Sequence, residues 1–102
     1  MRKVVVFDEA VEDIERAKDF YDSQQFGVGD YCADSLVADI ERLALFHGIH
    51  SRHFGFYRML ASRFPLGIYY RDTLSETQVF AVLDFRRDPT WIREELTKRK
   101  SG

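Results

Sequence analysis

Residues 79–91 read VFAVLDFRRDPTW and join an apolar run to a charged turn and then to a helix-like segment. The run VFAVL is apolar at every position, which is typical of a central strand whose two faces are both shielded from water. Asp88 followed by Pro89 is typical of a helix start, with aspartate as the N-cap and proline at the first helical position. The stretch therefore predicts a buried strand over residues 78–85 that leads into a short C-terminal helix. The packing side of that helix would carry Trp91, Ile92 and Leu96.

Two shorter segments upstream have the composition of strands that would pair with this one. Residues 56–60 (FYRML) and 66–71 (LGIYYR) are rich in aromatic and branched side chains, and turn-like sequence separates them from each other and from residues 78–85. We expect a three-stranded antiparallel meander in which the tyrosines are mainly packing residues. These tyrosines are Tyr57, Tyr69 and Tyr70.

The N-terminal half predicts one strand and a helical hairpin. Residues 3–7 (KVVVF) are β-branched or aromatic and too few for a helix, so they favour a strand. Asp8 would cap a first helix with apolar residues at helical spacing. Asp30 would cap a second helix that ends at Gly48, the position of a left-handed C-cap. The expected order of elements is βααβββα.

The composition is that of one small globular domain. The 102 residues are 45% hydrophobic and 31% charged, which suits a single α+β domain spanning residues 1–102. The charge is uneven: residues 1–47 contain 5 basic and 11 acidic residues, net −6, whereas residues 48–102 contain 10 basic and 6 acidic residues, net +4. This asymmetry favours an anionic partner on the basic half.

No run of residues is long and apolar enough for a secretory signal or a membrane span. We therefore expect a cytoplasmic protein with no membrane contact. The single cysteine, Cys32, cannot form an internal disulfide and would pack as a small apolar residue.

Five arginines would lie at the ends of the meander strands, where they can converge. Guanidinium groups bind phosphate or carboxylate through two parallel hydrogen bonds. Strand alternation would point Arg86 and Arg87 to opposite faces. The alternative is that the arginines are solubilising charges or partners of Asp84, Asp88 and the acidic helices. The five are Arg58, Arg63, Arg71, Arg86 and Arg87.

Other candidate chemistry has less support. His47, His50 and His53 recur every three residues, but a closed zinc site needs a fourth ligand and the only cysteine lies turns away, so no metal is predicted. The chain has no glycine-rich phosphate loop and no nucleophile motif, so we expect no cofactor and no self-contained catalytic group. Trp91 would pack on the sheet, its commoner use, or anchor a partner.

The order of elements, with the motifs at residues 64–70 (FPLGIYY) and 86–91 (RRDPTW), resembles the toxins of the RelE/ParE superfamily from bacterial type II toxin–antitoxin systems. The resemblance extends over nearly the whole chain and is closer to the ParE branch. It implies a helical hairpin packed on a curved, mainly antiparallel sheet, and a cognate antitoxin that wraps the toxin with a segment that folds on binding. Members similar to ParE inhibit DNA gyrase by binding, whereas members similar to RelE cut messenger RNA in the ribosome.

The resemblance implies alternative sets of functional residues. As a ParE-like inhibitor the chain would bind gyrase through Arg86, Arg87 and Trp91, and the tail from Trp91 would be removable without loss of the fold. The antitoxin would cover Val11, Ile14, Tyr21, Leu36 and Ile40.

As a RelE-like endoribonuclease the chain would use Arg58, Arg63 and Arg86 to stabilise the phosphate in the transition state. It departs from that pattern because its meander has no lysine and Asp84 stands where many relatives have histidine. A third alternative is a degenerate, non-toxic member that still binds its antitoxin. None of the three requires sequence-specific binding of nucleic acid.

Overall fold

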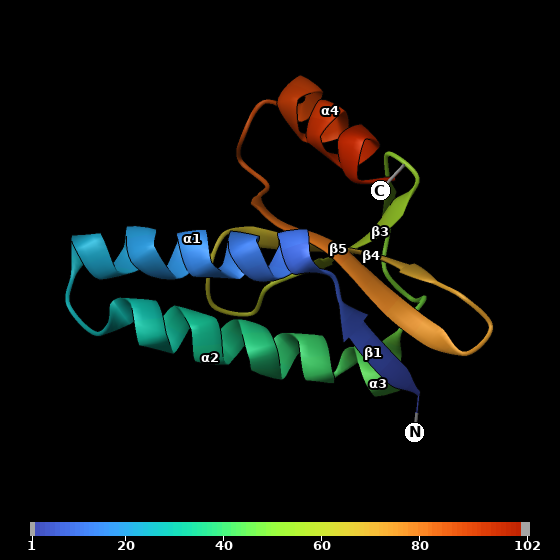
Figure 1. Cartoon of the computed structure of the whole chain (residues 1–102), viewed down its shortest axis with the longest axis horizontal. Helices are drawn as coiled ribbons and strands as arrows, with labels where there is room; N and C mark the ends of the chain where they lie inside the picture. Colours follow the sequence, from blue (N-terminus) through green and yellow to red (C-terminus); the bar gives the residue numbers. More distant parts are fainter. Residues whose placement is uncertain (1, 101–102) are drawn as a thin grey trace.

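The computed structural model describes residues 2–100 as three layers, in which a five-stranded sheet lies between a helical hairpin and a C-terminal helix (Figure 1). The elements are β1 (Lys3–Val6), α1 (Asp8–Gln24), α2 (Val28–Glu41), α3 (Leu43–Phe46), β2 (Arg52–His53), β3 (Phe56–Leu60), β4 (Leu66–Asp72), β5 (Glu76–Asp84) and α4 (Pro89–Lys100). The α+β class, the hairpin and the antiparallel meander of β3, β4 and β5 are confirmed. None of the helices within residues 2–100 has the length and apolarity to cross a membrane.

The sheet order is β1-β5-β4-β3-β2. β1 runs parallel to β5, with Val6 opposite Val79, and the other strand pairs are antiparallel. A parallel pair needs a long crossover, which the helical hairpin and the meander supply here. β1 ends early: the N–H of Phe7 donates to the carbonyl of Val79 at 3.0 Å, and the chain then turns into α1. Among residues 2–100, no strand covers this edge of β5 from Phe80 onward.

A β-bulge distributes the apolar side chains of β5 over both faces of the sheet. Tyr69 pairs with Ala81 and Tyr70 pairs with Val79, so Phe80 is the extra residue. Val79 and Val82 consequently join the core under the hairpin, whereas Phe80, Ala81 and Leu83 join the core under α4. The prediction of a central strand shielded on both faces is therefore confirmed.

The two long helices approach closely at Gly29, where an added Cβ would lie 2.3 Å from the carbonyl oxygen of Lys18. The turn before it is held by Asp22 at the end of α1, whose Oδ1 accepts the N–H groups of Gly27 at 2.9 Å and Gly29 at 3.1 Å. This carboxylate takes the capping role predicted for Asp30, so that prediction is wrong. Asp30 lies within the first turn of α2 and pairs with Lys18 at 3.3 Å.

Of the two other predicted N-caps, Asp88 is confirmed and Asp8 is wrong. Asp88 is a cap as predicted, since its Oδ1 accepts the N–H of Thr90 at 2.8 Å. Asp8 is not a cap, because it is already the first residue of α1, where its charge still favours the helix dipole. The second predicted helix is divided at Arg42 into α2 and α3. Gly48 has the expected left-handed backbone, with φ of 78°, but α3 ends at Phe46 and the extended His47 is its C-cap, so the helix does not end at Gly48 as predicted.

The short strand β2 was not predicted. It joins β3 through Phe54 and Gly55, whose φ angles are 57° and 87°. Two successive residues with positive φ form a tight hairpin turn. The sequence gives little warning of it, because phenylalanine rarely adopts this conformation.

Candidate partner-binding surfaces

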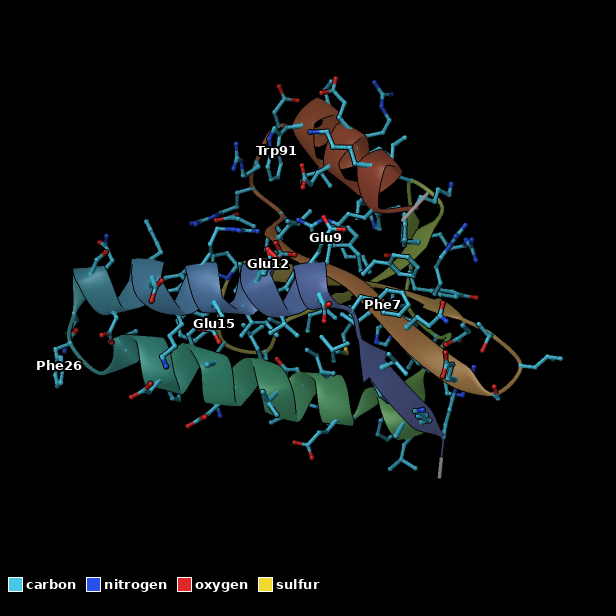
Figure 2. The ribbon with its side chains drawn as sticks, viewed as in Figure 1. Phe7, Glu9, Glu12, Glu15, Phe26 and Trp91 are labelled. Carbon is cyan, nitrogen blue, oxygen red and sulfur yellow. The ribbon has the colours of Figure 1, made fainter. Side chains whose placement is uncertain are left out.

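A cleft of about 490 Å³ lies between α1 and α4, over the uncovered end of β5; we call it the α1–α4 cleft. Phe20 and Tyr21 line it from α1. Trp91, labelled in Figure 2, lines it from the start of α4. The edge of β5 from Val82 to Asp84 forms its floor. The cleft is therefore aromatic on both walls, and it is open at an edge of the sheet.

A buried ion pair closes the inner end of the cleft. Asp13 on α1 is 4% exposed and Arg99 on α4 is 5% exposed. The guanidinium of Arg99 binds both carboxylate oxygens of Asp13, one of them at 3.0 Å, and also binds Glu95 at 3.0 Å. Asp13 in turn accepts the N–H of Val82 at 2.9 Å, and Arg99 donates to the carbonyl of Phe80 at 3.2 Å. The pair thus satisfies the strand edge that β1 leaves uncovered, and it ties α1, β5 and α4 together.

At the outer end of the cleft, Arg86 and Arg87 lie in the turn after β5 and not in the strand. The prediction that strand alternation separates them is therefore wrong, although their side chains do differ in contacts. Arg86 donates two hydrogen bonds to Asp84, from Nε to Oδ1 at 3.0 Å and from Nη2 to Oδ2 at 2.7 Å. Arg87 lies over the ring of Trp91 with its Cζ 3.6 Å from the centroid, a cation–π contact. Hydrogen bonding from Arg86 lowers the pKa of Asp84.

The predicted convergence of five arginines is only partial. Arg58 lies near the turn, 5.7 Å above the ring of Phe85, and Arg63 is exposed in the connection between β3 and β4. Arg71 pairs with Gln78, toward the other end of β5, and lies over Phe56. Arg71 is thus separated from the others.

The sheet tyrosines are packing residues, as predicted. Tyr69 and Tyr70 are 1% and 0% exposed, and burial raises the pKa of both hydroxyls. Arg58 lies across the strand pair from Tyr69, and its Nε is buried with no hydrogen-bond partner. Cys32 is also buried, as predicted, and burial raises the pKa of its thiol to about 11.

A second, apolar groove of about 460 Å³ lies between β1 and the helical hairpin; we call it the hairpin groove. Of the five residues predicted to meet the antitoxin, Val11, Ile14 and Ile40 line this groove. Tyr21 lines the α1–α4 cleft instead. Leu36 is 0% exposed and packs in the core, so no partner can reach it and its assignment is wrong. The prediction also missed other lining residues, namely Val4, Val6, Ala33 and Val37.

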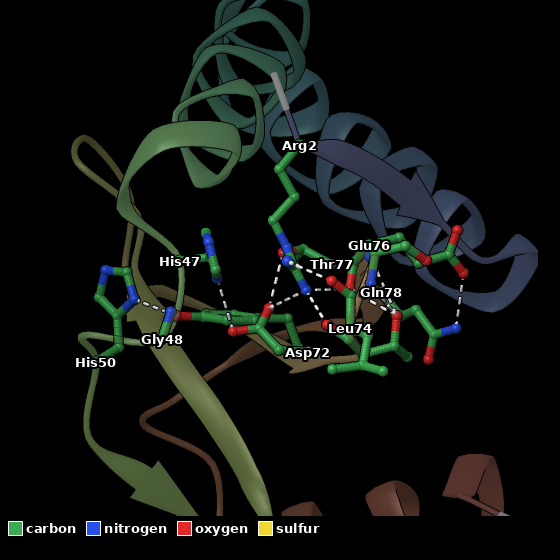
Figure 3. A network of polar contacts seen from close by, with 12 residues as sticks. Arg2, His47, Gly48, His50, Asp72, Leu74, Glu76, Thr77 and Gln78 are labelled. Carbon is green, nitrogen blue, oxygen red and sulfur yellow. Dashed lines mark hydrogen bonds and ion pairs between the residues drawn. The ribbon is translucent and has the colours of Figure 1, made fainter.

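The histidines have separate partners. His47 Nδ1 lies 2.8 Å from Asp72, while His50 Nδ1 lies 2.5 Å from the hydroxyl of Tyr70, which also accepts the N–H of Gly48 at 2.8 Å (Figure 3). These contacts anchor the loop after α3 to β4. Within residues 2–100, no three histidine, cysteine or acidic side chains are grouped so that they could hold a metal.

The fate of the C-terminal tail differs from the prediction. Removal of residues from Trp91 onward would delete Ile92, Leu96 and Arg99, all of which are buried. Truncation would therefore uncover the core under α4 and leave the buried Asp13 with only the largely exposed Arg16 as its ion-pair partner. The expectation that the fold survives it is wrong, and point substitutions are needed to test this surface.

No protein-family model matches the chain, and no curated protein is similar to it in sequence. Its fold is similar to that of a chain in the solved structure described as "Chromosomal ParDE TA system from P. aeruginosa", with a TM-score of 0.73 and 15% identity. The match covers 82% of this chain and 96% of that chain. At this identity the likeness concerns the fold, and the fold implied by the RelE/ParE resemblance is confirmed.

Proposed function

We propose that this chain is the toxin of a type II toxin–antitoxin module and that it inhibits DNA gyrase by binding, as ParE-like members do. The observation that carries the proposal is the likeness in fold to a chain of a ParDE system, which spans nearly all of that chain. A fold alone does not specify an activity, so the surfaces have to support the choice. Two of them are suited to binding proteins.

The hairpin groove is the proposed site of the antitoxin. Val11, Ile14 and Ile40 give it an apolar floor, and Glu15 and Glu41 supply negative charge among its lining residues. An amphipathic helix with an apolar stripe and flanking lysines or arginines would match both features. An antitoxin segment that folds on binding would supply such a helix.

The outer end of the α1–α4 cleft is the proposed gyrase-binding surface. Trp91 and Arg87 stack there, and tryptophan and arginine are the residue types that most often dominate the energy of an interface. Arg86 lies beside them, but its charge is compensated by Asp84. We therefore expect Arg87 and Trp91 to contribute more to binding than Arg86.

Endoribonuclease activity is the second candidate, and the unpaired Nε of Arg58 favours it. This Nε is buried beside Tyr69, so Arg58 would have to turn outward to offer it to a phosphate oxygen. The geometry of Arg86 argues against it, because the two hydrogen bonds to Asp84 occupy the donors that a phosphate would need. The nearby carboxylate would also repel the phosphate. Binding without catalysis is thus the better-supported function.

The test is pulse labelling of DNA and protein synthesis in bacteria, in the minutes after the chain is induced without an antitoxin. We expect thymidine incorporation to fall first. Arg87→Ala and Trp91→Ala should abolish this effect while the proteins stay folded. The matched control is Arg93→Ala, which removes an exposed arginine of α4 that does not line the cleft.

The other outcomes separate the alternatives. An earlier fall in methionine incorporation, with cuts in ribosome-bound message, would establish the endoribonuclease and shift attention to Arg58. Harmless expression of the folded wild-type chain would support the degenerate, non-toxic member. Full toxicity of both cleft variants would refute the assignment of the gyrase-binding surface.

A further inference from the structure

Residues 42–71 contain no acidic residue at all, yet they contain five arginines and all three histidines of the chain. This segment therefore has a net charge of +5, while the rest of the chain has −7, since the whole chain has −2. It comprises α3, β2, β3 and most of β4. This segment forms the β2–β3 side of the sheet, opposite to β1, and there Arg42 is paired with Asp39.

The strand β3 has a partly free edge in this region. β2 pairs only with Phe56 and Tyr57, and the N–H of Arg58 then donates to the carbonyl of Ser51 at 2.9 Å. Within residues 2–100, no strand continues along this side of β3 as far as Leu60. The N–H of Ala61 points toward β4, where it donates to Leu66. Because backbone groups alternate along a strand, the N–H and C=O of Leu60 point outward.

A groove of about 600 Å³ follows this free edge; we call it the β3-edge groove. Phe46 and Ile49 form its far wall and are 52% and 74% exposed, and Leu60 on the strand is 52% exposed. Three large exposed apolar side chains around an unpaired strand edge form a surface that promotes association with other chains, and proteins normally cover such an edge. Here the surface is left uncovered by residues 2–100.

The far wall is held in place by polar contacts beneath it. His50 and Gly48, which flank Ile49, both bind the hydroxyl of the buried Tyr70, and His47 binds Asp72 (Figure 3). These contacts fix the loop on β4, the strand beside β3, before any ligand arrives. Because the walls of the groove are already ordered, less conformational entropy is lost when a ligand binds.

We propose that the β3-edge groove binds an extended peptide segment with alternating apolar and acidic side chains, which adds to the sheet as a strand beside β3. Arg58 and Met59 are successive residues of β3 that both line the groove, and they point to opposite faces of the sheet. An added strand would place apolar side chains beside Met59, Phe46 and Ile49. Its alternate side chains would meet Arg58 and Leu60 on the other face, where Arg58 favours a carboxylate.

Two other occupants fit these observations less well. A nucleic acid would be attracted by the arginines, but it would present phosphates to the outward carbonyl of Leu60 and gain nothing from Phe46 and Ile49. A second copy of this chain, paired edge to edge, would bring residues 42–71 of both copies together, and each of these segments has a net positive charge. Like charges at such an interface oppose association. An acidic peptide satisfies the charge, the apolar wall and the strand edge at once.

The experiment uses the full chain and a short labelled peptide of alternating valine and glutamate. Binding is measured by fluorescence anisotropy, and the Leu60 amide is followed by hydrogen exchange. We expect saturable binding that slows exchange at Leu60, and at least about tenfold weaker binding in Ile49→Asp and Leu60→Asp, because each removes a central apolar contact and adds repulsion. The matched control is Leu74→Asp, since Leu74 is likewise an exposed apolar residue but lies in the turn between β4 and β5.

The controls decide between the occupants. Equal binding of a valine–lysine peptide, or equal loss of binding in Leu74→Asp, would overturn the proposal. So would a peptide that leaves exchange at Leu60 unchanged. Tighter binding of a single-stranded oligonucleotide, lost in Ile49→Asp, would reassign the groove to nucleic acid. Thermal unfolding of each variant checks that the fold is retained. Since the β3-edge groove is separate from the hairpin groove and the α1–α4 cleft, these results do not depend on whether the chain is toxic.

Discussion

Two pairs of aspartate and arginine lie at opposite ends of the α1–α4 cleft and differ mainly in their exposure. The side chains of Asp13 and Arg99 are 3% and 4% exposed, whereas those of Asp84 and Arg86 are 30% and 62% exposed. Both arginines bind both oxygens of their carboxylate. The inner pair also replaces a missing strand partner for β5, while the outer pair joins the last residue of β5 to the solvent-exposed turn after it. Similar geometry thus supports the fold at one end, whereas at the other end it is exposed beside the proposed gyrase-binding surface.

Arg99→Ala should have the largest effect on stability. It leaves the buried carboxylate of Asp13 with only the largely exposed Arg16, at 2.8 Å, as its ion-pair partner. Breaking a buried pair costs roughly 3–5 kcal/mol in proteins, and because Arg16 remains we expect a loss at the lower end of that range. The loss is a large part of the stability of a domain of this size, about 5–15 kcal/mol. Urea unfolding measures it, with Arg93→Ala on the same helix as the control. A loss no greater than that of the control would mean that the inner pair does not hold α4 on the sheet.

The double variant Asp13→Leu with Arg99→Met tests why the inner pair is present. Buried ion pairs can often be replaced by apolar residues without loss. Here the N–H of Val82 and the carbonyl of Phe80 would lose their partners, so we expect a remaining loss of roughly 1–3 kcal/mol for each unsatisfied group. Wild-type stability in urea would show instead that the strand edge does not need these side chains.

The inner pair also marks the limit of what the sequence predicts. Local patterns were sufficient for the meander, the hairpin, the Asp88 cap and the left-handed Gly48, because each depends on neighbouring residues. Asp13 and Arg99 are 86 positions apart, and their meeting depends on the parallel pairing of β1 with β5 and its early end. The role of Asp22 as a cap for the next helix depends likewise on how the two helices pack.

In the candidate surfaces, too, some features follow from local sequence patterns and others depend on how the elements pack. Helical periodicity selected Val11, Ile14 and Ile40, which line the hairpin groove, but it could not tell the groove from the core, and Leu36 was misassigned for that reason. The motif RRDPTW placed Arg87 and Trp91 together, since both belong to one turn and the helix after it. Their pairing, and the commitment of Arg86 to Asp84, became visible only in three dimensions.

Arg86→Ala should change stability far less than Arg99→Ala, because water and salt screen exposed pairs. The small difference from the wild type at low salt should vanish at about 1 M salt, where charges are screened within about 3 Å. The loss caused by Arg99→Ala should persist at high salt, because the inner pair is shielded from ions. Urea unfolding at the two salt concentrations measures both. A salt-independent effect of Arg86→Ala would mean that the outer pair supports the fold.

The smallest expected effect is the pH dependence contributed by Asp84. Hydrogen bonding from Arg86 lowers the pKa of Asp84 in the folded state, so the folded protein binds this proton less readily than the unfolded chain does. The resulting stabilisation is fully present above the unfolded pKa, about 4, and is lost as the pH falls through the lower folded value. Asp84→Asn should therefore be slightly less stable than the wild type at neutral pH and equal to it in strong acid. If urea unfolding gives the same difference at both pH values, the outer pair contributes nothing through its charge, and the contrast with the inner pair would rest on burial of the hydrogen bonds alone.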